Sequence, residues 1–420
     1  MALAESCVLP RPSRVLSTET LTHADLRVAK AILYSDFVGP MDKDPGNTVI
    51  MCPHLAWELS MQTFEWRTPD APFALSAKME PLILEEMEKG YKFQHLAKWG
   101  AKGRIALAEV WVKYYPLAKD ARKFKARPLS RCCVEPFSTL ERKAARAAVA
   151  IFQASIDTDV PHLPTVAGLL PRLKTMAQSL LASTDSSPHS DWVTSSASDD
   201  VVGCYGALDP GVALQLWEKF ADRMKESAKK GQCCAYVACP NDPVVLGSEA
   251  SYRRPQGAVV YDLDTITEIM RYTLRFRSVR LGTLVLEQKG GLFQGRPLSV
   301  VLCLVALDEM ERRGPCSMIR SVRYVDDKFS IAASRPSSSR TPEERVQAYN
   351  QRYDSRLTLE AEDRFPTGEW LFLGALLNEK PGNRAEYTAK ALVKNSVYPT
   401  LRLRPTLLNI PGVTSMPVRT

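Results

Sequence analysis

Alternation of apolar and polar side chains is clearest between Ser321 and Ala333, where the sequence reads SVRYVDDKFSIAA. Two short runs of β-branched and aromatic residues flank a pair of aspartates, and such runs suit half-buried strands. The pattern predicts two strands joined by a tight hairpin, with Asp326 and Asp327 at its tip. One explanation is a plain turn, because Asp is a common turn residue. The other is a metal site, because two carboxylates at a hairpin tip suit Mg²⁺, which takes few protein ligands.

Apolar residues at helical spacing predict helices elsewhere in the chain, over 82–91, 140–156, 211–224 and 262–276, and from residue 298 onward. Pro210 stands where a helix start tolerates its missing N–H. Either Asp262 or Asp264 is expected to cap the helix that follows it. The Ser-rich stretch 177–198 predicts a linker or loop that leads into a short strand. Residues 279–288 predict a strand pair about Gly282.

Charge is distributed unevenly along a chain whose overall composition is that of an ordinary globular protein. The 420 residues are 45% hydrophobic and 24% charged, with a formal net charge of +8. Between Lys113 and Arg146 ten Lys and Arg stand against three Asp and Glu. Pro116 and Pro128 keep this stretch from forming one helix, so an extended basic hairpin is expected. A solvated surface would explain the charges, and so would a surface that faces phosphate groups.

Several function classes find no support in the sequence. Ten cysteines include no CxxC pair, so neither a zinc site nor a disulfide framework is indicated. No GxSxG, HExxH or GxxxxGK[ST] pattern occurs, which disfavours a triad hydrolase, a zinc protease and a Walker nucleotidase. The N-terminus lacks a signal-peptide pattern, and no apolar run reaches membrane-spanning length. We expect an intracellular protein without a membrane partner, and the sequence does not choose between nucleus and cytoplasm.

A glycine-bearing loop precedes the apolar helix that begins near Leu298. Its sequence is QKGGLFQGRPLS, and its glycines allow a ligand to approach the backbone closely while the helix N-terminus favours negative charge. Such a loop is weak evidence alone. It gains weight from its position shortly before YVDD.

Five motifs in a fixed order resemble those of the reverse transcriptase family. KFKARPL, DVVGCYGAL, QKGGLFQGRPLS, YVDD and WLFLGALL follow one another between residues 119 and 377. The likeness is to retroelement-type or telomerase-like enzymes rather than retroviral ones. The resemblance implies an α+β fold of the right-hand polymerase type, with fingers, a palm and a short or incomplete thumb. We expect an N-terminal helical region of unknown role over 1–90, basic fingers over 91–190, a palm over 191–378 and a thumb-like tail over 379–420.

The resemblance also implies a set of site residues. The metal-binding and catalytic positions would be Asp200, Asp326 and Asp327. The nucleotide-binding positions would be Lys125, Arg127, Tyr205, Gln294, Gly295 and Ser299, with Lys119 and Lys123 as weaker candidates for the triphosphate. The reaction would be RNA-directed DNA synthesis with two Mg²⁺ ions, for which Mn²⁺ is a possible substitute, and the partners would be an RNA template, a DNA primer and dNTPs. Tyr205 would crowd the 2′ position of the nucleotide and favour dNTPs.

Three features depart from the family pattern. Arg296 stands where the family generally has a small residue, so it either contacts phosphate or alters the pocket. Asp199 precedes Asp200, and only the spacing to Tyr205 favours the second of the two as the metal ligand. The chain ends about 40 residues after Leu377, which suggests a short thumb, weak processivity or a fragment of a larger element.

Alternatives therefore stay open at this point. One is an enzyme of the same fold that copies RNA into RNA. Another is a domesticated relative that binds nucleic acid without catalysis. A third is an unrelated α/β protein with a fortuitous set of motifs. Lys328, next to the aspartate pair, would contact a primer strand or moderate the repulsion between carboxylates.

Overall fold

The protein is described from a computed structural model of the 420-residue chain. It describes residues 37–40, 48–51, 66–67, 79–93, 96, 108–117, 120–131, 137–156, 161–163, 165, 168–182, 192–227, 233–237, 243–247, 257–281, 284–288, 290–293, 295–312, 318–362, 364, 368–373, 375–379 and 387–391. The expected thumb-like tail falls largely on 392–420, outside these residues.

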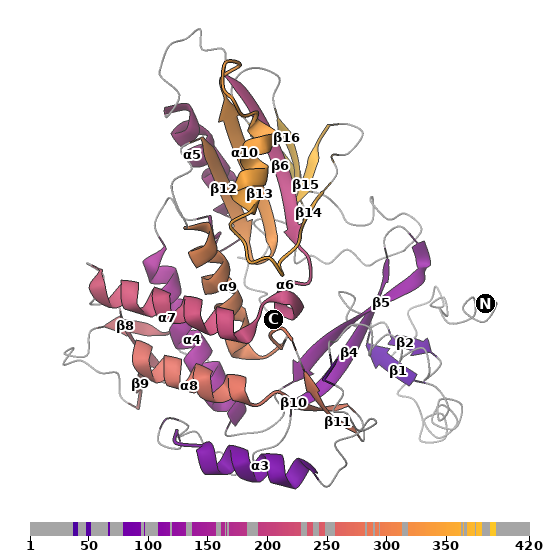
Figure 1. The fold of residues 1–420 in the computed structure, drawn as a ribbon, viewed down its shortest axis with the longest axis vertical. Coiled ribbons are helices and arrows are strands. Elements are labelled where there is room, and N and C mark those ends of the chain that lie inside the picture. The colour runs from indigo at the N-terminus through magenta and orange to yellow at the C-terminus, as the bar shows by residue number, and fades with distance from the viewer. Residues whose placement is uncertain are drawn as a thin grey trace, which may run out of the picture.

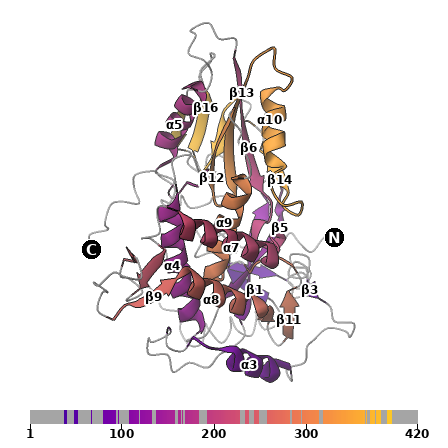
Figure 2. The same ribbon diagram turned by 60° about the vertical axis from the view of Figure 1, so that its left-hand side comes forward.

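A four-stranded antiparallel sheet forms the upper part of the molecule (Figure 1). Its order is β12-β13-β6-β14, with bounds Ile319–Tyr324, Asp327–Ser334, Val193–Val201 and Leu359–Ala361. Helix α10 (Pro342–Asn350) covers one face, and helix α5 (Leu169–Ala182) covers the other (Figure 2). Alternation along the strands sends Val322, Phe329 and Ile331 toward α5. The same alternation gives the α10 face Ile319 and Ala332.

A helical layer lies below the sheet and contains the largest apolar core. It is made of α4 (Phe137–Ser155), α7 (Pro210–Glu226), α8 (Leu263–Arg275) and α9 (Pro297–Glu311), with the one-turn helix α6 (Cys204–Ala207) at its upper edge and α3 (Met79–Gly90) at its base. Every residue of α9 from Val301 to Glu311 is buried, including the carboxylates Asp308, Glu309 and Glu311 near its C-terminal end. Local sequence fixes the helix starts. Asp209 accepts hydrogen bonds from two backbone amides of α7, and Asp262 accepts one from α8.

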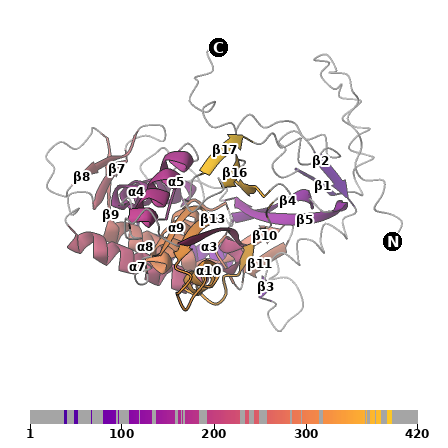
Figure 3. The ribbon, with the colours of Figure 1, turned by 90° about the horizontal axis from the view of Figure 1, so that it is seen from above.

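The basic segment belongs to a second large sheet, of order β3-β11-β10-β4-β5. Its strands are Trp66–Arg67, Leu284–Gln288, Ser278–Leu281, Ala108–Leu117 and Asp120–Arg131. Seen from above, the β4–β5 hairpin and the helices α7 and α8 lie on opposite sides of β13 and α10 (Figure 3). Three smaller sheets pair β1 with β2 (Phe37–Pro40, Thr48–Met51), join β8-β7-β9 (Val245–Gly247, Cys234–Val237, Val259–Asp262), and join β15-β16-β17 (Trp370–Phe372, Ala375–Glu379, Tyr387–Ala391).

Most predicted elements are confirmed. The hairpin at 321–333, the strand pair about Gly282, the basic hairpin and the five helices are all present. The linker predicted over 177–198 is wrong in part, because α5 extends to Ala182 and β6 already begins at Val193. The serines of β6 suit a strand here because side chains from neighbouring segments bond to them. Ser198 donates to the Glu362 carboxylate at 2.6 Å, for example. Within the described ranges no helix is long and apolar enough to cross a membrane.

A short segment at 161–163 joins the sheet to the helical layer through hydrogen bonds and a ring contact. The Arg323 amide donates to the Pro161 carbonyl at 2.7 Å, and the Leu163 amide donates to the Arg323 carbonyl at 2.7 Å. His162 lies between these bonds and packs against Phe152, with 5.2 Å between ring centroids. Burial lowers the pKa of His162 to about 3, and the charge of Arg323 adds to the effect.

This pKa predicts an acid-sensitive fold. His162 binds a proton below about 6.5 when unfolded but only below about 3 when folded, so the unfolded state gains protons first and stability falls as the pH drops through that window. Between pH 7 and pH 5 the wild type should lose about 2 kcal/mol more unfolding free energy than His162→Gln. Urea unfolding of both proteins at the two pH values measures this. An equal loss of unfolding free energy in the wild type and in His162→Gln would contradict the lowered pKa of His162.

Candidate active site

A strained two-residue turn joins β12 to β13. Tyr324 pairs with Asp327, which leaves Val325 and Asp326 as the turn residues. Val325 has a φ of 58°, in the left-handed region that Gly adopts easily and that a β-branched residue rarely does. The Asp326 carbonyl accepts a hydrogen bond from the Val201 amide at 3.2 Å. The hairpin tip is therefore tied to the end of β6.

Strand register separates the two adjacent aspartates of β6. Asp327 lies opposite Asp200, and Lys328 lies opposite Asp199. Because neighbours on a strand point to opposite faces, Asp200 and Asp327 share the face that α5 covers further along, while Asp199 and Lys328 share the α10 face. Asp200 and Asp327 are partly exposed, whereas Asp199 is buried. The structure thus brings together Asp200, Asp326 and Asp327 at one strand end.

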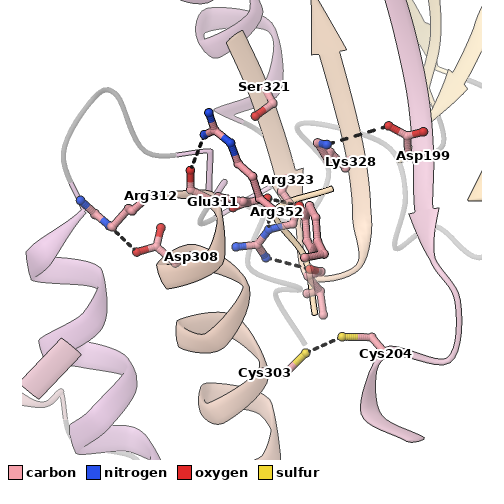
Figure 4. Close-up of polar contacts among 12 residues, drawn as sticks. Asp199, Cys204, Cys303, Asp308, Glu311, Arg312, Ser321, Arg323, Lys328 and Arg352 are labelled. Atoms are coloured by element: carbon pink, nitrogen blue, oxygen red, sulfur yellow. Dashed lines mark hydrogen bonds and ion pairs between the residues drawn. The ribbon is translucent and has the colours of Figure 1, made fainter. Parts of the chain in front are cut away.

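Lys328 is buried on the α10 face and directed away from solvent (Figure 4). Its ammonium donates to the Asn350 side-chain oxygen and lies 4.0 Å from the Asp199 carboxylate. Asn350 in turn donates to Asp199 at 3.2 Å, and the ring of Tyr349 lies 4.6 Å from the ammonium. Burial lowers the pKa of Lys328 to about 8, with Asp199 opposing that shift. In this position Lys328 packs beneath the turn and does not face a bound strand.

A buried ion pair adjoins the same turn and was not singled out by the sequence patterns (Figure 4). Arg323 is fully buried, and its Nε donates to the Glu311 carboxylate at 2.9 Å. Its Nη1 donates to the Val325 carbonyl at 2.8 Å. Burial lowers the pKa of Arg323, but Glu311, Tyr353 and Asp308 together outweigh burial, so the net shift is upward and the guanidinium stays charged. The available signal was a charged residue alternating with apolar ones on a buried strand.

The glycine loop is joined to α6 by two backbone contacts. The Leu292 amide donates to the Tyr205 carbonyl at 2.5 Å. Gly291 has a φ of 70°, and a Cβ added to it would lie 2.2 Å from the Gly206 carbonyl oxygen. Gly295 is exposed just before α9, and Ser299 is buried in its first turn. Gln294 lies outside the described residues.

Arg296 is directed into the protein and not toward solvent. Its guanidinium lies 2.7 Å from the Glu141 carboxylate of α4 and donates to the Phe276 carbonyl at 3.3 Å. Only 7% of Arg296 is exposed. Burial raises the pKa of Glu141, although Arg296 opposes that shift. This arrangement joins α4, α8 and the start of α9, and it does not present the guanidinium to a phosphate.

The proposed triphosphate contacts lie on β5. In the antiparallel pairing of β4 with β5, Lys125 is opposite Tyr115 and Arg127 is opposite Lys113. Lys123 lies on the same strand, and Lys119 falls outside the described residues.

The donor chemistry at the hairpin tip fits Mg²⁺. Carboxylate oxygens are its preferred protein ligands, and one or two of them suffice where substrate phosphates supply others. In the part of the chain that the structure describes, no three His, Cys, Asp or Glu side chains are close enough to enclose a metal ion. Asp200, Asp326 and Asp327 would hold the ions together with substrate, and not as a closed protein cage.

Comparisons with known proteins identify the fold only. The sequence matches no protein-family profile and no curated protein. Among solved structures, apo telomerase from Candida tropicalis aligns over 87% of this chain and 58% of its own, with 12% identity and a TM-score of 0.50. Telomerase from Candida albicans in complex with a fragment of telomeric RNA covers 87% of this chain and 55% of its own, with 13% identity and a TM-score of 0.47. The BmCPV RNA-dependent RNA polymerase at elongation state covers 83% of this chain and 26% of its own, with 12% identity and a TM-score of 0.40.

The alignment with apo telomerase gives the chain a polymerase-like α+β fold similar to that of this telomerase chain. The chain spans less than two thirds of the length of those telomerase chains. At 12% identity the likeness concerns the fold alone, because one fold can carry many different activities.

Gly291→Ala tests the contact between the glycine loop and α6. The new methyl group would meet backbone, so the loop or α6 must move, in addition to the strain of a positive φ. We expect a loss of about 2–4 kcal/mol in unfolding free energy. Gly257→Ala is the matched control, because Gly257 has a φ of 75° with nothing within 4 Å, and it should lose only about 1 kcal/mol. Urea unfolding measures both variants. Equal losses of unfolding free energy in Gly291→Ala and Gly257→Ala would show that the contact with α6 does not contribute to stability.

Proposed function

We propose that this protein is a template-directed nucleic-acid polymerase, and more specifically an RNA-directed DNA polymerase of a retroelement. The observation that carries the proposal is the β6–β13 register, which sets Asp200 level with Asp327 beside the turn that contains Asp326. A carboxylate set at a hairpin tip, within a polymerase-like fold, suits phosphoryl transfer, which depends on positioning and charge stabilisation. The ordered motifs in the sequence support the same class.

Asp200 and Asp326 would hold two Mg²⁺ ions, with Asp327 beside them. Bound there, the ions would stabilise the attacking 3′-oxygen and the leaving pyrophosphate. Asp199 is the weaker candidate, because its carboxylate is buried on the α10 face against Asn350 and Lys328. In the sequence only the spacing to Tyr205 favours Asp200 over Asp199 as the metal ligand. The burial of Asp199 supports the same choice.

The nucleotide would lie between the turn and the glycine loop. Tyr205 would crowd its 2′ position, and the bond from the Leu292 amide to the Tyr205 carbonyl fixes the backbone there. Gln294, Gly295 and Ser299 would line the pocket for nucleotide and template. Lys125 and Arg127, two positions apart on β5, would contact the triphosphate. The partners would be an RNA template and a DNA primer.

A second candidate is a relative that binds nucleic acid without catalysis. It is favoured by one observation, namely that Arg296, which stands where the family generally has a small residue, is paired with the buried Glu141 carboxylate at 2.7 Å. Such a protein would bind template in a salt-dependent way, through its basic hairpin, and incorporate no nucleotide. Primer extension separates the two candidates.

Asp326→Asn tests the reaction. Incorporation of dNTPs on an RNA template with Mg²⁺ should fall by at least about 1,000-fold, since the amide cannot supply the ionised ligand. Asp200→Asn should have the same effect. Asp199→Asn should keep incorporation at a temperature where it is folded but lower the melting temperature, because Asp199 interacts with buried Lys328. Template binding without incorporation in the wild type would favour the second candidate, and loss of incorporation in Asp199→Asn alone would reverse the ligand assignment.

Tyr205→Ala tests sugar discrimination. Removal of the ring should raise incorporation of NTPs relative to dNTPs by about 10- to 100-fold, because the pocket would no longer exclude a 2′-hydroxyl. The measurement is kcat/KM for each nucleotide on one primer-template, with Tyr205→Phe as the control that keeps the ring. An unchanged ratio would remove Tyr205 from the selectivity pocket, and a wild type that prefers NTPs would identify an RNA-copying RNA polymerase.

A further inference from the structure

The hairpin turn that carries Asp326 has a strained backbone. Apart from Gly, only Val325 and Leu373 among the described residues have a positive φ. A valine side chain at a φ of 58° is crowded by its own backbone, and such a residue persists only when its surroundings hold it there. The surroundings of Val325 therefore determine how Asp326 is presented.

Two hydrogen bonds fix the backbone on either side of Asp326. The Val325 carbonyl accepts from Arg323 Nη1 at 2.8 Å, which orients the peptide before Asp326. The Asp326 carbonyl accepts from the Val201 amide at 3.2 Å, which orients the peptide after it. The second bond belongs to the sheet. The first is made by a side chain.

The guanidinium that makes this bond is itself held in place. Arg323 Nε donates to the Glu311 carboxylate at 2.9 Å, and both side chains are fully buried. The Tyr353 hydroxyl also donates to the Glu311 carboxylate, and Arg352 donates to the Glu311 carbonyl at 3.1 Å. Glu311 ends α9, so this network joins the helical layer to the hairpin tip (Figure 4). An Arg serves here because its planar fork bonds two acceptors at once, which an ammonium on a flexible stem does poorly.

Arg323 lies on the α10 face, as Lys328 does, while Asp200 and Asp327 share the other. It therefore acts through the backbone and not by contact with substrate. We infer that Arg323, held by Glu311, is a positioning residue that keeps the strained Val325 peptide in place and so presents Asp326 for the proposed reaction. This inference rests on the proposed function.

The test compares Arg323→Lys with the same protein carrying Val325→Gly in addition. Lysine keeps the charge beside Glu311 but loses the fork, so kcat for dNTP incorporation should fall by about 100-fold while KM changes little. Binding of Mn²⁺, followed by electron paramagnetic resonance without nucleotide, should weaken by about tenfold. Glycine adopts a positive φ without strain, so Val325→Gly should restore kcat by at least about tenfold in the Arg323→Lys background.

Arg312→Lys is the matched control. Arg312 makes a similar pair with fully buried Asp308 on the same helix, at 2.8 Å, but no bond to the turn is described for it. It should alter stability without changing kcat or Mn²⁺ affinity by more than about twofold. If Arg323→Lys fails to fold, Tyr353→Phe provides a milder variant, since it removes one bond to Glu311 and should lower kcat by about threefold.

Several outcomes would overturn the inference. One is an equal loss of kcat and of Mn²⁺ affinity in Arg323→Lys and Arg312→Lys. Another is that Val325→Gly does not restore kcat in the Arg323→Lys background. A third, where Arg323→Lys does not fold, is an unchanged kcat in Tyr353→Phe. If the wild type incorporates no nucleotide, the polymerase proposal fails, and amide hydrogen exchange at Asp326 and Asp327 still tests the positioning role. Exchange that accelerates in Arg323→Lys but not in Arg312→Lys would support it, and equal exchange would refute it.

Discussion

The pairing of β6 with β13 is the constraint on which the candidate site depends. A strand alternates its side chains with a period of two, so a slip of one residue would move every side chain of β6 to the other face. In the observed register Asp200 lies opposite Asp327 and Asp199 lies opposite Lys328. The register is fixed on both faces by packing against α5 and α10. The same pairing that buries the apolar residues of the sheet therefore decides which of two adjacent aspartates reaches the candidate site.

The α10 face carries charge directly behind the carboxylates. Arg323, Lys328 and Asp199 lie side by side across three strands, and Glu311 closes the row from the helical layer. Burial of such charges costs several kcal/mol per ion before pairing offsets it, so a well-packed apolar row would be at least as stable. What the charged row provides is a hydrogen bond of defined direction to the turn. The Arg323 fork reaches the Val325 carbonyl, and no apolar side chain can hold a strained peptide in that way.

Local sequence predicted the elements well and the long-range contacts poorly. The hairpin at Asp326 and Asp327 and the cap at Asp262 follow from periodicity and capping chemistry, which act over a few residues. The linker expected before Asp199 was wrong in part, because the serines of β6 were interpreted by composition. Ser196 accepts a hydrogen bond from Trp370 and Ser198 donates one to Glu362, both more than 160 residues away in the sequence. Partners at such separation leave no local pattern.

Arg296 illustrates the same limit within the candidate site. Its place in the QG-x-P-L-S block suggested either a phosphate contact or an altered pocket. Its partner in the structure is Glu141, on a helix 155 positions upstream, and no local sequence pattern links the two residues. A buried cation needs a buried anion, but the identity of that anion is a property of the fold.

The backbone around the candidate site is held by two separate devices. One is the contact of Gly291 and Leu292 with the segment of Tyr205 and Gly206, which involves only backbone atoms and requires a residue without a Cβ. The other is the bond from Arg323 to Val325, which involves a side chain and a buried counterion. The first fixes the element proposed to recognise the sugar, and the second fixes the element proposed to hold the metal ions. Because no described residue belongs to both devices, we expect that, under the proposed function, sugar selection and metal binding can be altered independently.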